Sequence, residues 1–447
     1  MSSAADLASD RRFARVLAAI AAAAVALRVT FVLVVDPVVP RIGDASAYHL
    51  LARGLASGAG YVRPFDLSLL GRVRPTAEYP PLFPTLLAAL DRVGLGSVGA
   101  QRLALCALGG ATVVLIGLLG RRAGGRRVGL VAAALAAVSP MLFLSEAILM
   151  AEALAVPLAA LAALLAYRAL ENPSGARFAG LGVALGALVL TRAEGVALAA
   201  LLVPVLAFRA GPDARTRFAR AATALGVALC VVAPWTIRNA IRLDGFVPVS
   251  TNAATLVDGA NCDAAYHGPL TGLWRETFSS GGGGADDGQE AACFEGFAVT
   301  DPGFSERAAA AEHLGEGIGY ARAHLSDLPR VATVRVLRTF GLWQPRAQAD
   351  YESLEGRPRR AQQTGTVLGW FVLGLAAFGA AVLHRRRRPQ WPLLAPILSA
   401  VVVSALTYGQ QRFRAGAEPA LCVLAAVALV TGARRFRPRP APTGAAR

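Results

Sequence analysis

Asp44 is a carboxylate at the point where the first long apolar stretch of the chain gives way to a polar one. It lies in Gly43-Asp44-Ala45-Ser46-Ala47-Tyr48, after an apolar run that extends from Phe13 to Val35. A carboxylate at a membrane–water boundary can abstract a proton or bind a metal ion. Aspartate is also a favoured N-cap residue, so Asp44 could simply cap the helix that follows. Its position alone leaves both interpretations open.

Further acidic, aromatic and basic side chains recur in the later polar segments. Guanidinium groups suit phosphate, because their paired N–H donors match its oxygens, whereas carboxylates suit proton transfer. Each residue also has a structural interpretation, since Arg238 and Arg414 could anchor helix ends and Glu194 could pair with Arg192. The candidates are Asp44, Tyr48, His49, Glu78, Tyr79, Glu146, Glu152, Arg192, Glu194, Arg238, Tyr408, Arg412 and Arg414.

The chain as a whole is strongly apolar and strongly basic. Its 447 residues are 55% hydrophobic, and apolar runs long enough to cross a bilayer recur along most of its length. The net charge is +16, and all 45 basic residues are arginine. They cluster at the ends of apolar runs, where they act as topology signals. This pattern excludes a soluble multidomain protein and argues against nucleic-acid binding.

The arginine clusters predict about ten transmembrane helices, with both ends of the chain inside. The strongest inner signals are Arg121–Arg127, Arg209–Arg220 and Arg385–Arg388. The first apolar run is too long for a secretory signal, so we expect it to be retained as a span. The amphipathic stretch Pro81–Leu90 is too short to cross the bilayer, which predicts an interfacial helix.

The predicted architecture is an all-α polytopic membrane protein with polar loops on the outer face. Residues 1–240 form a transmembrane module that includes the first outer loop, 36–98. Residues 241–362 form an outer-face loop region, and 363–433 form the C-terminal transmembrane helices. Residues 434–447 are a basic cytoplasmic tail.

Two of the 5 cysteines, Cys262 and Cys293, lie in the large outer region. We expect them to form a disulfide if that region faces an oxidising compartment. A metal site is a poorer interpretation, because no second pair of cysteines or histidines stands at zinc-finger spacing. Asp286 and Asp287 lie between them in glycine-rich sequence, which is typical of a solvated loop tip.

The topology places the candidate residues on one membrane face, although they come from non-adjacent segments. A passive structural membrane protein needs no such set, whereas a site for a charged lipid head group does. Several motifs occur there in an order that resembles a known family. They are Asp44-Ala45-Ser46-Ala47-Tyr48, Glu78-Tyr79-Pro80-Pro81-Leu82-Phe83-Pro84, Leu190-Thr191-Arg192-Ala193-Glu194, Pro234-Trp235-Thr236-Ile237-Arg238-Asn239, Pro248-Val249-Ser250-Thr251-Asn252 and Tyr408 to Arg414.

Together these motifs resemble bacterial GT-C glycosyltransferases of the protein O-mannosyltransferase and aminoarabinose-transferase type, which are glycosyltransferase family 39-like. The arginine-only, alanine-rich composition is similar to that of actinobacterial members. The resemblance implies a GT-C-like bundle and a sugar donor linked through phosphate to a polyprenyl lipid. It also implies transfer on the outer face of the plasma membrane to an acceptor hydroxyl of a glycan, glycolipid or protein.

The resemblance also implies roles for individual residues. Asp44 matches the aspartate presumed to deprotonate the acceptor, with inversion at the anomeric carbon. Glu152 would orient the acceptor or help to hold a divalent cation, which is the only cofactor left open. The expected phosphate-binding residues are Arg412, Arg414, Arg192 and Arg238. The expected substrate contacts are Tyr48, Glu78, Tyr79, Glu194 and Tyr408.

The sequence departs from the family at Ala45, where many members carry a second acidic residue after the aspartate. This departure weakens the case for a metal site and leaves Asp44 largely alone. The region after the seventh span lacks the large outer domain of oligosaccharide-transferring relatives, which favours a single-sugar transferase. A transporter or flippase for lipid-linked sugars, or an accessory protein of envelope assembly, remains the alternative. Neither the sugar nor the acceptor follows from the sequence.

Overall fold

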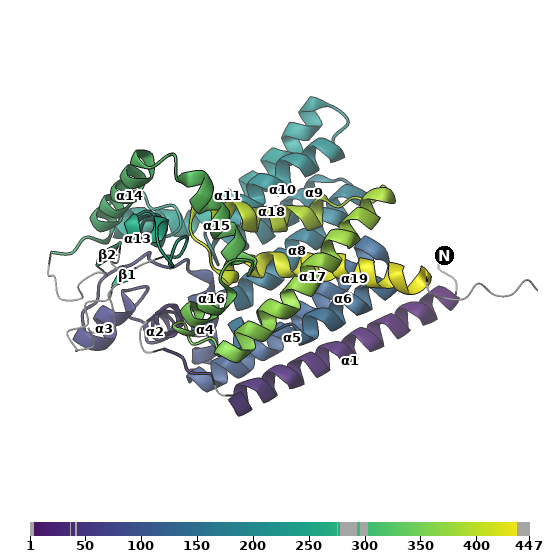
Figure 1. Ribbon diagram of the computed structural model, residues 1–447, viewed down its shortest axis with the longest axis horizontal. Coiled ribbons are helices and arrows are strands. Elements are labelled where there is room, and N and C mark those ends of the chain that lie inside the picture. Colours follow the sequence, from purple (N-terminus) through teal and green to yellow (C-terminus); the bar gives the residue numbers. More distant parts are fainter. Residues whose placement is uncertain are drawn as a thin grey trace, which may run out of the picture.

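The computed structural model describes residues 4–35, 37–40, 43–274, 276–277, 293–295 and 303–435. The described chain is almost entirely helical (Figure 1). The predicted loop tip with Asp286 and Asp287 lies outside the described residues, and so does the basic tail beyond residue 435.

Six helical segments are long and apolar enough to cross a bilayer. They are α1 (Ala4–Val35), α5 (Val98–Gly124), α8 (Glu152–Glu171), α11 (Ala214–Arg242), α17 (Arg359–Arg385) and the segment in which the 3-10 helix η1 (Gln411–Ala417) continues into α19 (Glu418–Arg435). The predicted tenth span is α19, but the sequence does not indicate the 3-10 helix before it.

The helices α6 (Arg126–Val138) and α7 (Pro140–Ala147) meet at an angle of 49°, and together they are long and apolar enough to make a seventh span. Pro140 accounts for the break, because proline lacks an N–H donor and favours the first position of a helix. Three shorter apolar helices are α9 (Gly175–Val189), α10 (Gly195–Ala210) and α18 (Trp391–Leu406). All ten predicted apolar segments are therefore helical, and the chain is a multi-pass membrane protein.

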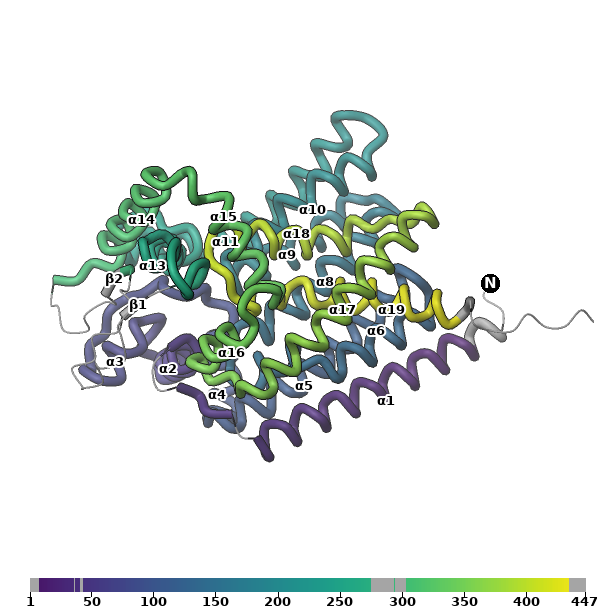
Figure 2. Tube along the Cα trace, viewed as in Figure 1, coloured from purple at the N-terminus to yellow at the C-terminus, as the bar shows by residue number. Residues whose placement is uncertain are grey.

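The polar segments form short helices that gather at one end of the bundle, opposite the N-terminus (Figure 2). They are α2 (Asp44–Ala56), α3 (Pro64–Leu70), α4 (Leu82–Arg92), α12 (Asn252–Gly259), α13 (Asp263–Tyr266), α14 (Glu306–Ala323), α15 (Leu328–Thr339) and α16 (Pro345–Ser353). The two-residue strands β1 (Glu276–Thr277) and β2 (Phe294–Glu295) pair in parallel. Cys262 and Cys293 are joined by a disulfide, with their Cα atoms 5.3 Å apart.

Packing connects this polar end to the bundle. Apolar residues of α2 and α4 form one buried cluster with the start of α5 and with residues 148–153. The predicted amphipathic helix at Pro81–Leu90 is α4, and its Phe83 and Leu87 are fully buried in that cluster. The cluster holds the N-terminus of α2 beside the N-terminus of α8, and thereby brings Asp44 near Glu152.

Candidate active site

Asp44 is the first residue of α2, and Gly43 is the N-cap of that helix. No side chain caps this helix end, so the interpretation of Asp44 as an N-cap is wrong. The carboxylate instead accepts two hydrogen bonds from distant parts of the chain. The Tyr79 hydroxyl donates to Oδ1 at 2.9 Å, and Arg412 Nη2 donates to Oδ2 at 2.7 Å. Burial raises the pKa of Tyr79 well above its ordinary value, so its hydroxyl remains a donor.

Arg412 is the centre of the polar cluster. Its guanidinium forms ion pairs with Asp44 at 2.7 Å, with Glu355 at 2.9 Å and with Glu152 at 3.3 Å. Arg412 lies on η1, which begins after Gln410, a residue with an extended backbone. This tight helix places Arg412 at the polar end of the bundle. The neighbouring residue Gln411 anchors η1, because its backbone N–H donates to Glu352 Oε1 at 2.9 Å.

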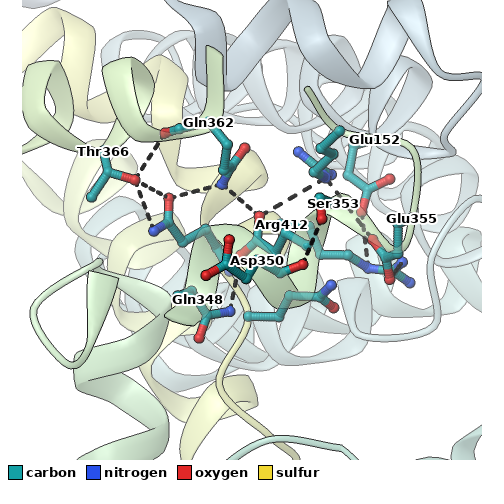
Figure 3. A network of polar contacts seen from close by, with 12 residues as sticks. Glu152, Gln348, Asp350, Ser353, Glu355, Gln362, Thr366 and Arg412 are labelled. Carbon is teal, nitrogen blue, oxygen red and sulfur yellow. Dashed lines mark hydrogen bonds and ion pairs between the residues drawn. The ribbon is translucent and has the colours of Figure 1, made fainter. Parts of the chain in front are cut away.

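Further side chains that hold η1 in place come from α16 and α17 (Figure 3). Gln362 Nε2 donates to Glu352 and, at 3.1 Å, to Gln411 Oε1. Thr366 and Gln411 also share a hydrogen bond of 3.0 Å. Gln348 Nε2 donates to Glu352 Oε1 at 3.0 Å. Because buried polar networks of this kind hold their members in one arrangement, they fix the position of Arg412.

Arg192, in the turn between α9 and α10, joins the same cluster. It forms close ion pairs with Glu152 and with Glu194, and its guanidinium lies 5.7 Å from the centre of the Phe413 ring. Glu152 is 1% exposed and is shared by Arg192 and Arg412. Four carboxylates, of Asp44, Glu152, Glu194 and Glu355, therefore surround two guanidiniums. Both arginines are paired with carboxylates, although Arg412 Nε makes no hydrogen bond to a described residue.

The aromatic candidates line the Asp44 side of the cluster. The rings of Tyr48 and Tyr79 pack edge-to-face at 4.9 Å, and the rings of Tyr408 and Phe413 do so at 4.8 Å. Glu78 precedes Tyr79, and burial opposed by Arg63 raises the pKa of Glu78 to about 7. Its backbone carbonyl accepts a hydrogen bond from Ser250, in one of the predicted motifs.

Four predicted candidates make their contacts elsewhere. Arg414 is turned into the bundle, where its Nε donates to Glu418 at 2.6 Å and its guanidinium lies against Gly369 of α17. Arg238 donates to the carbonyls of Thr76 and Tyr61, at 2.5 and 2.6 Å.

The other two candidates that lie apart, Glu146 and His49, each contact a residue of another helix. Glu146 pairs with Arg28 of α1 at 2.7 Å. His49 shares a hydrogen bond of 2.8 Å with Gln101.

The sequence interpretation missed Glu355 and Arg357, which flank the turn between α16 and α17. Glu355 pairs with Arg412, and Arg357 lies 3.9 Å from both Glu352 and Glu355. Their only sequence signal is a Glu-Gly-Arg tripeptide in a polar stretch without periodicity. Among the described residues, the one group of three metal-ligand side chains lies elsewhere, on α12 and α14, and consists of Asp258, His313 and Glu316.

A groove runs from the charged cluster between the apolar helices. Its polar end is formed by Glu152, Arg192, Glu194 and Arg412. Its remaining walls come from α8, α9, α10, α18 and η1 and include Leu188, Leu198, Pro396, Val403 and Phe413. Such a groove suits an amphipathic ligand with a charged head and an apolar tail.

Comparison with known proteins supports the same fold class. A family model described as dolichyl-phosphate-mannose-protein mannosyltransferase matches residues 78–237, which include Glu78, Glu152 and Arg192 but not Asp44 or Arg412. No curated protein matches the chain.

Solved structures match over nearly the whole chain. The archaeal oligosaccharyltransferase AglB from Archaeoglobus fulgidus, in complex with an inhibitory peptide and a dolichol-phosphate, is 14% identical with a TM-score of 0.54. That match covers 96% of this chain and 51% of the archaeal one, so the chain spans about half the length of this structure. The same enzyme tethered to an acceptor peptide is 15% identical with a TM-score of 0.53, over 95% of this chain and 50% of that one.

ArnT from Cupriavidus metallidurans, bound to undecaprenyl phosphate, is 15% identical with a TM-score of 0.41, over 92% of this chain and 77% of that one. The likeness to AglB shows that the chain shares the fold of the matched part of that enzyme, and the predicted all-α polytopic membrane fold is confirmed. These organisms give no support to the actinobacterial resemblance.

Proposed function

We propose that this protein is a membrane glycosyltransferase that moves one sugar from a polyprenyl-phosphate-linked donor to an acceptor hydroxyl on the outer face of the membrane. The observation that carries the proposal is the Asp44 carboxylate, which Tyr79 and Arg412 hold in place, together with the amphipathic groove whose polar end Arg412 helps to form. The match of the mannosyltransferase family model to residues 78–237 supports the same reaction class.

In the proposed reaction, Asp44 accepts the proton of the acceptor hydroxyl while that oxygen attacks the anomeric carbon. The bond from that carbon to the phosphate oxygen breaks, and the polyprenyl phosphate leaves with the electron pair. The attack is from the opposite face, so the configuration inverts. Negative charge grows on the departing phosphate, and guanidinium groups aimed at it stabilise the transition state more than the ground state.

The surrounding residues have supporting roles in this proposal. Tyr79 and Arg412 orient the Asp44 carboxylate, and Glu152 holds both Arg192 and Arg412 in place. Tyr48, Glu78, Glu194 and Tyr408 contact the substrates. The groove receives the polyprenyl chain, whose apolar carbons suit its leucine, proline and valine walls. A transporter would instead concentrate its working polar groups near the bilayer midplane.

The test is Asp44→Asn, assayed in membranes with a polyprenyl-phosphate sugar donor. Loss of a general base is expected to reduce transfer at least about 100-fold without lowering the amount of folded protein. Glu312→Gln is the matched control, because it removes one carboxylate charge from the exposed surface of α14. Near-normal transfer by Asp44→Asn would rule out the catalytic role and favour an accessory protein.

The donor sugar can be identified in the same cells. Mass spectrometry of lipid-linked sugars and envelope glycans, with and without the protein, is expected to reveal accumulation of one polyprenyl-phosphate sugar when the protein is absent. That species names the donor, and the glycan that loses the corresponding sugar names the acceptor.

A further inference from the structure

The turn between α16 and α17 is pressed against the chain segment that leads into Asp44. Its central residue, Gly356, has a φ of +86°, and a Cβ atom there would lie 2.3 Å from the Val38 carbonyl oxygen and 2.9 Å from Pro40 Cδ. Only glycine meets both requirements. The turn is therefore seated on the residues that precede α2, and its two flanking side chains are held at the polar cluster.

Those flanking side chains are Glu355 and Arg357. Glu355 pairs with Arg412 at 2.9 Å, which connects the turn directly to the partner of Asp44. Arg357 is 1% exposed, and its nearest carboxylate oxygens, of Glu352 and Glu355, lie 3.9 Å from its Nε. That separation is beyond hydrogen-bond distance.

Two adjacent hydrogen-bond donors of the Arg357 guanidinium lack a partner among the described residues. Nε and Nη2 are both buried, and neither has a hydrogen-bond partner within the described part of the chain. These two nitrogens form the side-on fork of the guanidinium, whose parallel N–H groups match two oxygens of a phosphate. A buried charged group with unmade hydrogen bonds is costly, which indicates that a ligand completes it.

The other arginines near the cluster are less suited to this task. Arg412 is shared among three carboxylates, and Arg192 between two. Arg414 also has two buried donors without a hydrogen-bond partner among the described residues, Nη1 and Nη2, but it is paired with Glu418 and lies against Gly369 inside the bundle, between α17 and α19. Arg412 has one buried donor without a hydrogen-bond partner, Nε, whereas Arg357 has two adjacent ones within the described part of the chain. A phosphate that bound Arg412 or Arg192 through two N–H groups would therefore have to displace a carboxylate.

We infer that Arg357 binds the phosphate of the polyprenyl-linked donor through its Nε–Nη2 fork, and that Glu355 positions Arg357 and Arg412 relative to each other. This inference rests on the proposed function. It places the phosphate between Arg357 and Arg412, next to the turn between α16 and α17. Asp44 then lies on the other side of Arg412, where the acceptor binds.

The experiment measures lipid binding to the full-length protein in detergent. The probes are undecaprenyl phosphate and undecaprenol, which differ only in the phosphate, and binding is followed by the rise in melting temperature with lipid concentration. Arg357→Gln is expected to weaken binding of undecaprenyl phosphate about 10- to 100-fold, as for lost hydrogen bonds to a charged group, and to leave undecaprenol binding unchanged. Arg360→Gln is the control, because Arg360 is an exposed arginine three residues further along the same chain segment.

Each outcome decides a separate point. Preferential loss of phosphate binding in Arg357→Gln but not in Arg360→Gln supports the inference. Equal binding by wild type and Arg357→Gln would overturn it and leave the proposed function intact. If the wild type does not distinguish the two lipids, the proposed donor class itself fails.

A conservative variant guards against misfolding. Arg357→Lys keeps the positive charge but loses the fork, so undecaprenyl phosphate should bind about tenfold more weakly than to the wild type. If Arg357→Gln does not fold, a folded Arg357→Lys with wild-type affinity would overturn the inference. Structural damage alone would weaken binding of both lipids and not of undecaprenyl phosphate selectively.

Discussion

Two side chains that are far apart in the sequence converge on the carboxylate of Asp44. Tyr79 follows it by 35 residues and Arg412 by 368, and each contacts a different oxygen. Each carboxylate oxygen retains a further lone pair, so the group can still accept a proton while both contacts orient it. The hydroxyl of Tyr79 can therefore be removed without removing the base.

Tyr79→Phe is expected to reduce transfer about 10- to 100-fold, because it deletes one hydrogen bond to a charged group. The ring remains, so its edge-to-face packing with Tyr48 and the melting temperature should be retained. Tyr320→Phe is the matched control, since within the described residues the Tyr320 hydroxyl has no hydrogen-bond partner. Unchanged transfer in Tyr79→Phe would show that Arg412 alone orients Asp44.

Glu78 is expected to make stability depend on pH. Burial raises its pKa from 4.5 to about 7, so the folded state holds the proton more tightly than the unfolded chain does. The resulting stabilisation is fully present below about pH 4.5 and is lost as the pH rises through about 7. Glu78→Gln removes this titration, so its melting temperature should fall less over that interval than that of the wild type.

At about pH 8 the Glu78→Gln variant should be the more stable protein, by at most about 3 kcal/mol. The exposed variant Glu312→Gln should follow the wild-type curve. Parallel curves for wild type and Glu78→Gln would mean that the Glu78 carboxyl is solvated in the membrane protein.

The residues of the polar cluster were only partly predictable from the sequence. Asp44, Glu152, Arg192, Glu194 and Arg412 were all singled out, because each stands at the polar end of an apolar run. Glu355 and Arg357 carry no such signal, since they lie in a tight turn whose place in space depends on the packing of Gly356 against Val38. That contact is set by tertiary structure and leaves no pattern in the local sequence.

At the scale of elements, glycines set how closely the helices approach. In α17 a Cβ atom at Gly379 would lie 1.9 Å from the Leu424 carbonyl oxygen of α19, whereas one at Gly374 would meet nothing within 4 Å. Small residues at such contacts allow membrane helices to pack backbone against backbone. Because η1 leads directly into α19, this contact also helps to place Arg412.

Gly379→Ala should destabilise the protein by about 1–3 kcal/mol, as overpacking does, and should lower the melting temperature. Gly374→Ala, on the same helix, should be neutral or slightly stabilising, because alanine is the better helix former. If Gly379→Ala melts like Gly374→Ala, the two helices do not approach as closely as the structure indicates.

The helices themselves were predictable, because length, apolarity and terminal arginines define a span almost independently of its neighbours. The exceptions arise where local and tertiary preferences differ. Pro140 divides the third span into α6 and α7, and the segment after α18 forms η1 and not a simple turn. The side-chain network around Gln411 stabilises η1, and sequence periodicity does not reveal such a network.

At the scale of the whole molecule, the polar helices α2–α4 and α12–α16 gather at the end of the bundle opposite the N-terminus (Figure 1). The disulfide between Cys262 and Cys293 belongs to this end, and disulfides persist in oxidising compartments. The arginine clusters lie in the connections toward the other end, which the positive-inside rule places in the cytoplasm. Both observations independently favour an extracytoplasmic polar cluster.

This orientation can be tested by labelling single cysteines in a background that lacks the free cysteines Cys106, Cys230 and Cys422. Val73→Cys lies between α3 and α4 at a residue that is 62% exposed, and in the predicted orientation it should react with a membrane-impermeant maleimide in intact cells. Ala214→Cys, at the exposed start of α11, should react only after permeabilisation. The reverse pattern would place Asp44 and the donor phosphate on the cytoplasmic side. The reaction would then have to draw on a lipid-linked sugar of the inner leaflet, although the ion pairs of Arg412 with Asp44 and Glu355 would be unchanged.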